Sequence, residues 1–296
     1  MKVVDLFSGC GGMSLGFQNE GFEILAAFDN WEPAVNVYRD NFKHPTFQLD
    51  IRTDEAKEQI AKFKGDVIIG GPPCQDFSIA GKREFEGRRA NLTICFAEIV
   101  SAIKPEWFVM ENVYNIEKSP ILPLAVEILH NVGYGITKQV LDASRCEVPQ
   151  ARHRFFMIGR LNEPDGFLSE ALTQGLSPHK MSVHDYLGNS LQTEFYYMHP
   201  RTYLRRAVFS VHEPSATIRG INRPIPQNYK RHHADKAAIE NGVRALTTKE
   251  RSYIQTFPDW FQFNGNPSDM ELAIGNAVPV NLAAYVARRV MEYAKK

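Results

Sequence analysis

Residues 66–75 are Asp66-Val67-Ile68-Ile69-Gly70-Gly71-Pro72-Pro73-Cys74-Gln75, a short apolar run that leads into a stiff turn and a thiol. An apolar run bounded by glycine and proline is typical of a buried strand. Because prolines fix φ and lack a backbone N–H, the turn would hold the Cys74 sulfur in one direction. We expect Cys74 just past a strand's carboxyl end, where open α/β sheets bind ligands. Free cysteines are often small core residues, so this segment alone leaves both roles open.

Strand-like and helix-like segments alternate on both sides of this turn, a pattern that predicts a doubly wound, mainly parallel α/β sheet. Strands are expected at residues 3–7, 22–28, 47–49, 67–69 and 107–110, with later ones at 135–141 and 154–159. Helices are expected to begin near residues 32, 54 and 91.

The alternation stops near residue 162, where prolines begin to recur. We expect one domain formed by residues 1–162 and 270–296, and a second, smaller and irregular domain with its hinge at residues 163–269. In the C-terminal segment Leu282, Tyr285 and Val286 share one helical face with Val290 and Tyr293, which predicts that this helix packs on the first domain.

Composition indicates an ordinary globular protein of 296 residues, 44% hydrophobic and 23% charged. We find no apolar run near the length of a membrane span and no signal peptide, so we expect a cytoplasmic protein with no membrane partner. Four cysteines without a C-x-x-C pair argue against a metal site or a disulfide framework.

Charge is balanced overall, with 34 basic and 34 acidic residues, but it is distributed unevenly. Residues 199–236 hold six Arg and two Lys against one Glu and one Asp, together with four His. A charge run is usually a solvated face, although this one also contains aromatic residues.

A glycine-rich turn, Ser8-Gly9-Cys10-Gly11-Gly12, follows the first expected strand and opens a helix, a context that lets a ligand approach the backbone. A dinucleotide fingerprint would need a third glycine at position 14, where Ser14 stands. Asp29 and Asp50 end the next two expected strands, where they could accept hydrogen bonds from ribose hydroxyls and an adenine amino group. A nucleoside ligand without a pyrophosphate fits, and S-adenosylmethionine is the leading candidate. Each acid alone could also be a turn or cap residue.

Glu111-Asn112-Val113 follows the strand expected at 107–110. Glu111 and Cys74 would then face one crevice from neighbouring strand ends, a nucleophile and an acid within reach of one ring. A capping role for Glu111 is the alternative.

Taken together, five segments in this order resemble the motifs of DNA (cytosine-5) methyltransferases of the bacterial or phage restriction-modification type. They are Asp5-Leu6-Phe7-Ser8-Gly9-Cys10-Gly11-Gly12, Gly71-Pro72-Pro73-Cys74-Gln75, Glu111-Asn112-Val113, Gln150-Ala151-Arg152-His153-Arg154 and Ile274-Gly275-Asn276-Ala277-Val278-Pro279. The resemblance implies a Rossmann-like, S-adenosylmethionine-dependent fold, with S-adenosylhomocysteine as product and residues 163–269 as a target-recognition domain.

The resemblance also implies a mechanism. Cys74 would add to C6 of cytosine and thereby make C5 nucleophilic. Glu111, when protonated, would donate to N3, and Arg152 and Arg154 would hold the base, the thiolate region or a phosphate. The base that removes the C5 proton is not identified by the sequence.

Duplex DNA is the implied substrate, and its target cytosine must flip out of the helix. Residues 78–91, with Arg83 and Arg88, would form a loop that closes over the flipped base. Thr217 lies in Glu213-Pro214-Ser215-Ala216-Thr217-Ile218-Arg219-Gly220, which resembles the segment that packs against the flipped-base site in relatives. We expect DNA contacts from Arg219, Arg223 and Arg231 as well.

Cofactor contacts are implied for nine positions: Phe7, Gly9, Gly11, Gly12, Asp29, Asp50, Leu92, Asn276 and Val278. Asp29 departs from the family, which usually has Glu there. Asn30 follows where an aromatic residue is frequent, with Trp31 one place later, so the stacking partner of the adenine stays open.

Two alternative functions predict different sequence features. An RNA methyltransferase on the same scaffold would have a reduced recognition region and a second cysteine motif, which we do not find. An inactive sequence-binding regulator would lack Cys74 or Glu111, and both are present. We expect a monomer, with a cognate restriction endonuclease acting on the same site without a stable complex.

Overall fold

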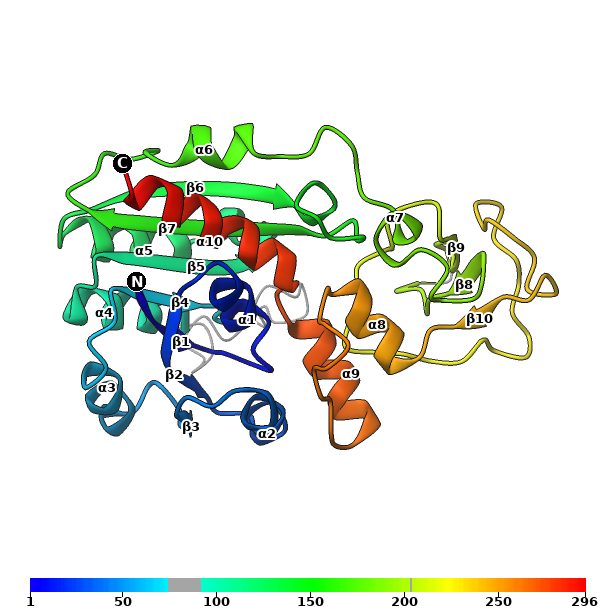
Figure 1. Cartoon of the computed structure of the whole chain (residues 1–296), viewed down its shortest axis with the longest axis horizontal. Helices are drawn as coiled ribbons and strands as arrows, with labels where there is room; N and C mark the ends of the chain where they lie inside the picture. Colours follow the sequence, from blue (N-terminus) through cyan, green and yellow to red (C-terminus); the bar gives the residue numbers. More distant parts are fainter. Residues whose placement is uncertain (74–91, 203) are drawn as a thin grey trace.

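The computed structural model describes residues 1–73, 92–202 and 204–296. Its main feature is a seven-stranded sheet of order β3-β2-β1-β4-β5-β7-β6 (Figure 1). The strands are β1 (Lys2–Leu6), β2 (Glu23–Asp29), β3 (Thr46–Gln48), β4 (Val67–Gly70), β5 (Trp107–Val113), β6 (Tyr134–Asp142) and β7 (His153–Leu161). The first five are parallel, and β7 runs antiparallel to both of its neighbours. The predicted fold class is confirmed.

Helices cover both faces of this sheet, which is why β4 is buried along its whole length. One core cluster packs strands against α1 (Gly12–Asn19), α6 (Ser169–Gln174) and α10 (Val280–Ala294). The other packs them against α3 (Asp54–Ala61), α4 (Leu92–Ile103) and α5 (Ile121–His130). Helices on both faces therefore hold the sheet in place.

The C-terminal helix α10 packs on α1. Leu282 and Val286 belong to the same core cluster as Phe17. A Cβ on Gly16 would lie 2.5 Å from Ala283 Cβ, so the two helices approach at backbone distance. By length and composition Pro267–Ala294 could cross a membrane, but 83% of its apolar window is buried inside the protein, as in core helices.

A second, small sheet of order β10-β8-β9 lies at the right of Figure 1. It contains β8 (Phe195–Tyr197), β9 (Val208–Ser210) and β10 (Arg244–Ala245), with α7 (Val183–Leu187) and α8 (Thr248–Ile254) nearby. Its core includes Tyr196, Phe209 and Ile254. Little regular structure occurs between β9 and β10, which fits the prolines of this region.

Helix α9 (Pro267–Asn276) joins the two parts of the molecule. Ile274 packs in the core of the small sheet, whereas Ala273 packs with Leu15 of α1 and Val37 of α2 (Glu32–Asn41). The domain boundary that we expect at residue 270 falls inside this helix.

Candidate active site

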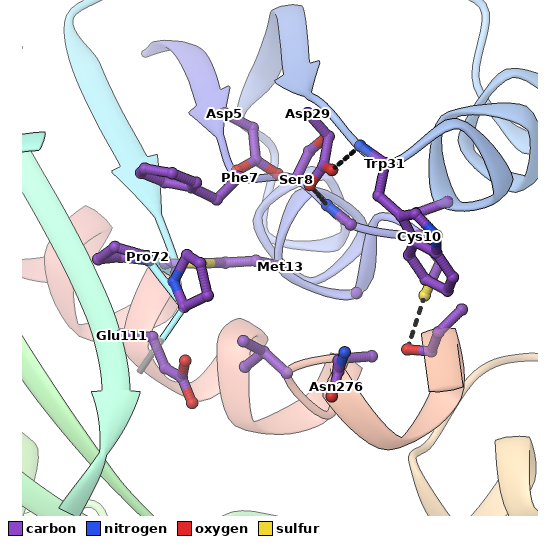
Figure 2. Close-up of a pocket in the computed structure, with 18 of the residues that line it drawn as sticks. Asp5, Phe7, Ser8, Cys10, Met13, Asp29, Trp31, Pro72, Glu111 and Asn276 are labelled. Atoms are coloured by element: carbon purple, nitrogen blue, oxygen red, sulfur yellow. Dashed lines mark hydrogen bonds between the residues drawn. The ribbon is translucent and has the colours of Figure 1, made fainter. Parts of the chain in front are cut away.

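A cavity of about 680 Å³ opens at the carboxyl ends of β1, β2, β4 and β5 and is closed on one side by α9 (Figure 2). Eleven of the sequence-predicted residues line it: Phe7, Gly9, Gly12, Asp29, Asp50, Leu92, Glu111, Arg152, Arg154, Asn276 and Val278. Pro72 and Pro73 line it as well. Cys74, Arg83 and Arg88 lie outside the described residues, as does the predicted loop 78–91.

The turn after β1 has the conformation that its glycines allow. Gly9 has φ +53° and Gly11 has φ +96°, and even Phe7 takes φ 58°. A Cβ on Gly9 would meet no atom within 4 Å, so this part of the wall is open to a ligand. Gly11 is different, because its missing Cβ leaves room for Phe42 and Tyr38, and it does not line the cavity.

Asp29 at the end of β2 fixes the shape of this turn. Its Oδ2 accepts from Gly9 N at 2.8 Å and its Oδ1 accepts from Trp31 N at 2.8 Å. Burial raises the pKa of Asp29, against the lowering effect of these backbone donors. Trp31 itself lines the cavity. It is therefore an aromatic candidate for the stacking partner of the adenine, which the sequence leaves open.

Asp50 lies two residues beyond β3 rather than at its end. It is held by Arg52, whose Nε donates to Oδ1 at 2.8 Å, and this hydrogen bond lowers the pKa of Asp50. The carboxylate is therefore an ionised acceptor at the rim of the cavity.

Glu111 lies within β5, opposite Phe156 of β7, and not after the strand as the sequence predicted. The strand continues because the β7 pairing extends to Val113. The side chain is buried, and Arg154 Nε lies 2.8 Å from its Oε1. Burial raises the pKa of Glu111, and Arg154 offsets part of that effect.

The next residue ties this strand to the proline turn. Asn112 Nδ2 donates to Pro72 O at 3.0 Å, and a Cβ on Gly71 would lie 3.4 Å from Glu111 Oε2. Figure 2 shows Pro72 and Glu111 on the same side of the pocket. Gly71 and Pro72, which shortly precede Cys74 in the sequence, therefore lie beside β5 and the buried Glu111 side chain.

Arg152 and Arg154 bind different partners. It is 1% exposed, and its guanidinium donates to the carbonyls of Ile218 at 2.9 Å, Gly275 at 3.1 Å and Ala277 at 3.1 Å. It therefore joins β7, α9 and the 213–220 segment through backbone groups. No sequence pattern indicated these contacts, because all three partners are distant in the chain.

The predicted DNA contacts among the described residues lie in the small domain. Thr217 Oγ1 donates to Ala151 O at 3.0 Å, and the Arg219 guanidinium donates to His199 O. Arg223 and Arg231 are exposed and have no acidic partner among the described residues.

Two further arginines join this group. Burial lowers the pKa of Arg219, and the charges of Arg201 and Arg205 lower it further. The pKa of His199 is lowered by burial and then by Arg223 and Arg219. Arg206 is separate, because it pairs with Glu213 at 2.9 Å. We call Arg201, Arg205, Arg219 and Arg223 the arginine cluster; the sequence predicts only Arg219 and Arg223 as DNA contacts.

Comparison with known proteins gives consistent results. A family model described as C-5 cytosine-specific DNA methylase matches residues 1–292. Type II methyltransferase M.HindV of Haemophilus influenzae is 56% identical over 298 residues, covering 100% of this chain and 98% of that protein. Type II methyltransferase M.HgiDI of Herpetosiphon aurantiacus is 53% identical over 294 residues, covering 99% and 95%.

Solved structures share the fold at low sequence identity. The S. pombe Dnmt2 methyltransferase superposes with a TM-score of 0.76 at 19% identity, covering 100% of this chain and 99% of that one. The Entamoeba histolytica methyltransferase EhMeth gives a TM-score of 0.76 at 18% identity with the same coverage.

Proposed function

The chain belongs to the C-5 cytosine-specific DNA methylase family, and from this premise we propose how its own residues carry out the reaction. It methylates cytosine in DNA in the context of a restriction-modification system. The observation that carries the mechanism is the buried Glu111–Arg154 pair beside the proline turn that leads into Cys74.

Cys74 is the nucleophile in this proposal. Its thiolate forms a bond to cytosine C6, and the electron pair of the C5–C6 double bond becomes available at C5. S-adenosylmethionine supplies an electrophilic methyl group on a sulfonium when bound. Once C5 carries the methyl group, its proton is removed, the C5–C6 double bond forms again and the Cys74 sulfur leaves with its electron pair.

Glu111 acts on the opposite edge of the ring. Addition at C6 increases electron density at N3, and a protonated carboxyl group there donates a hydrogen bond or its proton. Burial of Glu111 favours the protonated form, which supports this role. Arg154 holds the carboxyl in place through the 2.8 Å contact, whereas Arg152 acts as a positioning residue through its three carbonyl partners.

The cavity fits the methyl donor. It has an open wall at Gly9. Two of its lining residues, Asp5 and Ser8, each have a buried side-chain oxygen without a hydrogen-bond partner among the described residues. Asp29 would accept hydrogen bonds from the ribose hydroxyls, and Asp50 would accept one from the adenine amino group. Trp31 offers an aromatic face on which the adenine could stack. The walls would come from Phe7, Gly12, Leu92, Asn276 and Val278.

The substrate is double-stranded DNA in this proposal, bound with the target cytosine turned out of the helix. The arginine cluster supports it, because several cations that have no acidic partner among the described residues suit a phosphate backbone. We propose that the protein is a monomer. A restriction endonuclease would act on the same DNA sequence without forming a stable complex with it.

Two experiments test the function. Bisulfite sequencing of DNA from a methylation-free host that expresses the chain should show 5-methylcytosine in one sequence context; unmodified DNA would contradict the activity. Duplexes with 5-fluorocytosine at that target should form a covalent adduct with the wild-type protein and none with Cys74→Ser. An efficiently methylated duplex whose fluorinated version forms no adduct would exclude the Cys74 mechanism.

A further inference from the structure

A buried ion pair connects α8 to α9, the two helices that lie between the main sheet and the small sheet (Figure 1). Arg251 Nε lies 2.7 Å from Glu271 Oε2, and both side chains are buried. These two atoms are close but are not aligned for a hydrogen bond. Because the desolvation of two charges can offset their attraction, a buried ion pair is weak evidence for a stabilising role. The other partners of the two side chains therefore indicate what the pair does.

Both side chains bind one short segment of the small domain, residues 219–223. The Arg251 guanidinium donates to Arg219 O, and Glu271 Oε1 accepts from Asn222 Nδ2 at 3.0 Å. Asn222 Nδ2 also donates to Leu246 O at 2.8 Å. Because Arg219 and Asn222 are three residues apart, these contacts fix the segment at two points.

Glu271 is itself held in place. Its Oε1 also accepts from Thr248 Oγ1 at 2.7 Å, while Oε2 faces Arg251. The helix that carries Glu271 contacts the same segment, because a Cβ on Gly220 would lie 2.5 Å from Leu272 Cδ1. A hydrogen bond has a direction that an apolar contact lacks, so Glu271 determines where Asn222 lies as well as how closely it packs.

The held segment carries exposed groups on both sides of Asn222. Ile221 is 48% exposed, and Arg223 is exposed as well. The Asn222 side chain between them is partly buried and bonded to Glu271. Arg219, at the other point of attachment, belongs with Arg223 to the arginine cluster. The attachment of Asn222 therefore sets the placement of the exposed side chains next to it.

We propose that Glu271, through Asn222 and Arg251, positions residues 219–223 so that they select the DNA sequence. The inference rests on the proposed function, in which double-stranded DNA is the substrate. It makes Glu271 a positioning residue that determines specificity without touching DNA.

Selectivity should depend on this positioning more than general DNA affinity does. A bidentate contact to a base edge needs two aligned hydrogen bonds, whereas the attraction between an arginine and a phosphate falls off gradually with distance. A small displacement of residues 219–223 should therefore weaken recognition of the target sequence first.

The double variant Arg251→Met, Glu271→Leu tests the proposal, because it removes both charges together and fills the same space with apolar groups. Methylation rates with S-adenosylmethionine are measured on the target duplex identified by bisulfite sequencing and on duplexes with one base pair changed. We expect the ratio of kcat/KM between target and changed duplexes to fall about 10- to 100-fold, mainly through a higher KM for the target. The affinity for S-adenosylmethionine should stay within about twofold, since both side chains lie outside the cavity lining formed by the described residues.

Asn222→Ala tests the same contact from the other side. It leaves the ion pair intact and removes the donor to Glu271 and Leu246 O, so it should reduce selectivity in the same way. In the double-variant background it should have little further effect, because the carboxylate partner is already absent. An undiminished loss in that background would show that Asn222 acts on DNA directly and would contradict the proposal. If the double variant does not fold, Asn222→Ala decides, and unchanged selectivity then contradicts us.

Thr248→Val is the matched control. It removes another hydrogen bond to Glu271 Oε1 and leaves residues 219–223 and both charges unchanged. It should keep the sequence preference of the wild-type protein. An equal loss in this variant would show that any disturbance of the joint reduces selectivity, which would exclude a specific role for the contact with Asn222.

The outcomes separate this inference from the proposed function. A folded double variant that keeps the preference of an active wild-type protein would refute the inference alone. A uniform loss on all duplexes would also overturn it, because the segment would then contribute to DNA affinity without selecting sequence. A wild-type protein that methylates no DNA would refute the proposed function, and this inference with it.

Discussion

Gly275 of α9 and Gly220 of the 213–220 segment are in direct backbone contact. A Cβ on Gly275 would lie 2.1 Å from Gly220 N, and a Cβ on Gly220 would lie 2.5 Å from Leu272 Cδ1. Leu272, Gly275 and Asn276 also line the cavity. One short helix therefore forms a wall of the cavity and supports the region that carries the arginine cluster.

Gly275→Ala should disturb both functions of α9. The added methyl group meets backbone atoms that cannot rotate away, so we expect a loss of about 1–3 kcal/mol in stability together with weaker binding of S-adenosylmethionine and of DNA. Chemical denaturation and ligand titration measure these effects. Gly65→Ala is the milder control, because its Cβ would lie no closer than 3.1 Å to another atom, against 2.1 Å for Gly275. Equal behaviour of the two variants would show that the contact is not critical.

Glu111→Gln should reduce the methylation rate by about 10²- to 10⁴-fold, because the amide cannot supply a proton at N3. The raised pKa of Glu111 adds a pH effect: the protonated acid persists to higher pH than in a free glutamic acid, and the rate should fall as the pH rises through that pKa. Single-turnover rates across pH measure both effects. Glu106→Gln, which removes an acid paired with Arg160 away from the cavity, should leave the rate unchanged. A normal rate in Glu111→Gln would exclude the acid role.

Arg201→Ala and Arg205→Ala should each weaken DNA binding and lower the slope of affinity against salt concentration by about 1. The reason is that each removes a cation that has no acidic partner among the described residues. Arg39→Ala on α2 serves as the control. A loss equal on all sequences indicates phosphate contacts, and a loss confined to the target sequence indicates base contacts. Unchanged salt slopes would remove these residues from the DNA interface.

Glu271→Ala should destabilise the joint between the domains. Glu271 Oε2 lies 2.7 Å from Arg251 Nε, and the Arg251 side chain is 2% exposed. Removing the acid leaves a buried cation, so we expect a loss of about 3–5 kcal/mol. The double variant Arg251→Met, Glu271→Leu should recover part of it, because both charges are then absent. If the double variant is less stable than Glu271→Ala, the burial argument is wrong.

Several features of the site were predictable because they depend on local chemistry. The apolar run at Val67–Gly70 forms a central parallel strand, and Asp29 ends β2, which lies on the other side of β1 in the same sheet. Parallel strands present their carboxyl ends together, so residues placed there by the sequence meet without any knowledge of packing. The order of the five motifs was likewise sufficient to indicate the family.

Other features depend on residues far apart in the chain. Glu111 lies inside β5 because β7, more than forty residues later, extends that strand by pairing with it. Arg152 and Arg154 are separated by one residue, yet one binds three carbonyls from two distant segments and the other binds Glu111. Spacing alone predicts that both side chains point the same way, and it contains no information about what they meet there.

By itself, the sequence determined the sheet, the family and the residues with the required chemistry, because strand patterning and motif order are local properties. The tertiary structure decided which of these groups are buried, paired or left without a partner. Asp5 illustrates the difference: in the sequence it is one acid at the end of a strand, and only packing removes its water and leaves Oδ1 without a hydrogen-bond partner among the described residues. Desolvation arises from all the surrounding segments at once, and therefore no single stretch of sequence encodes it.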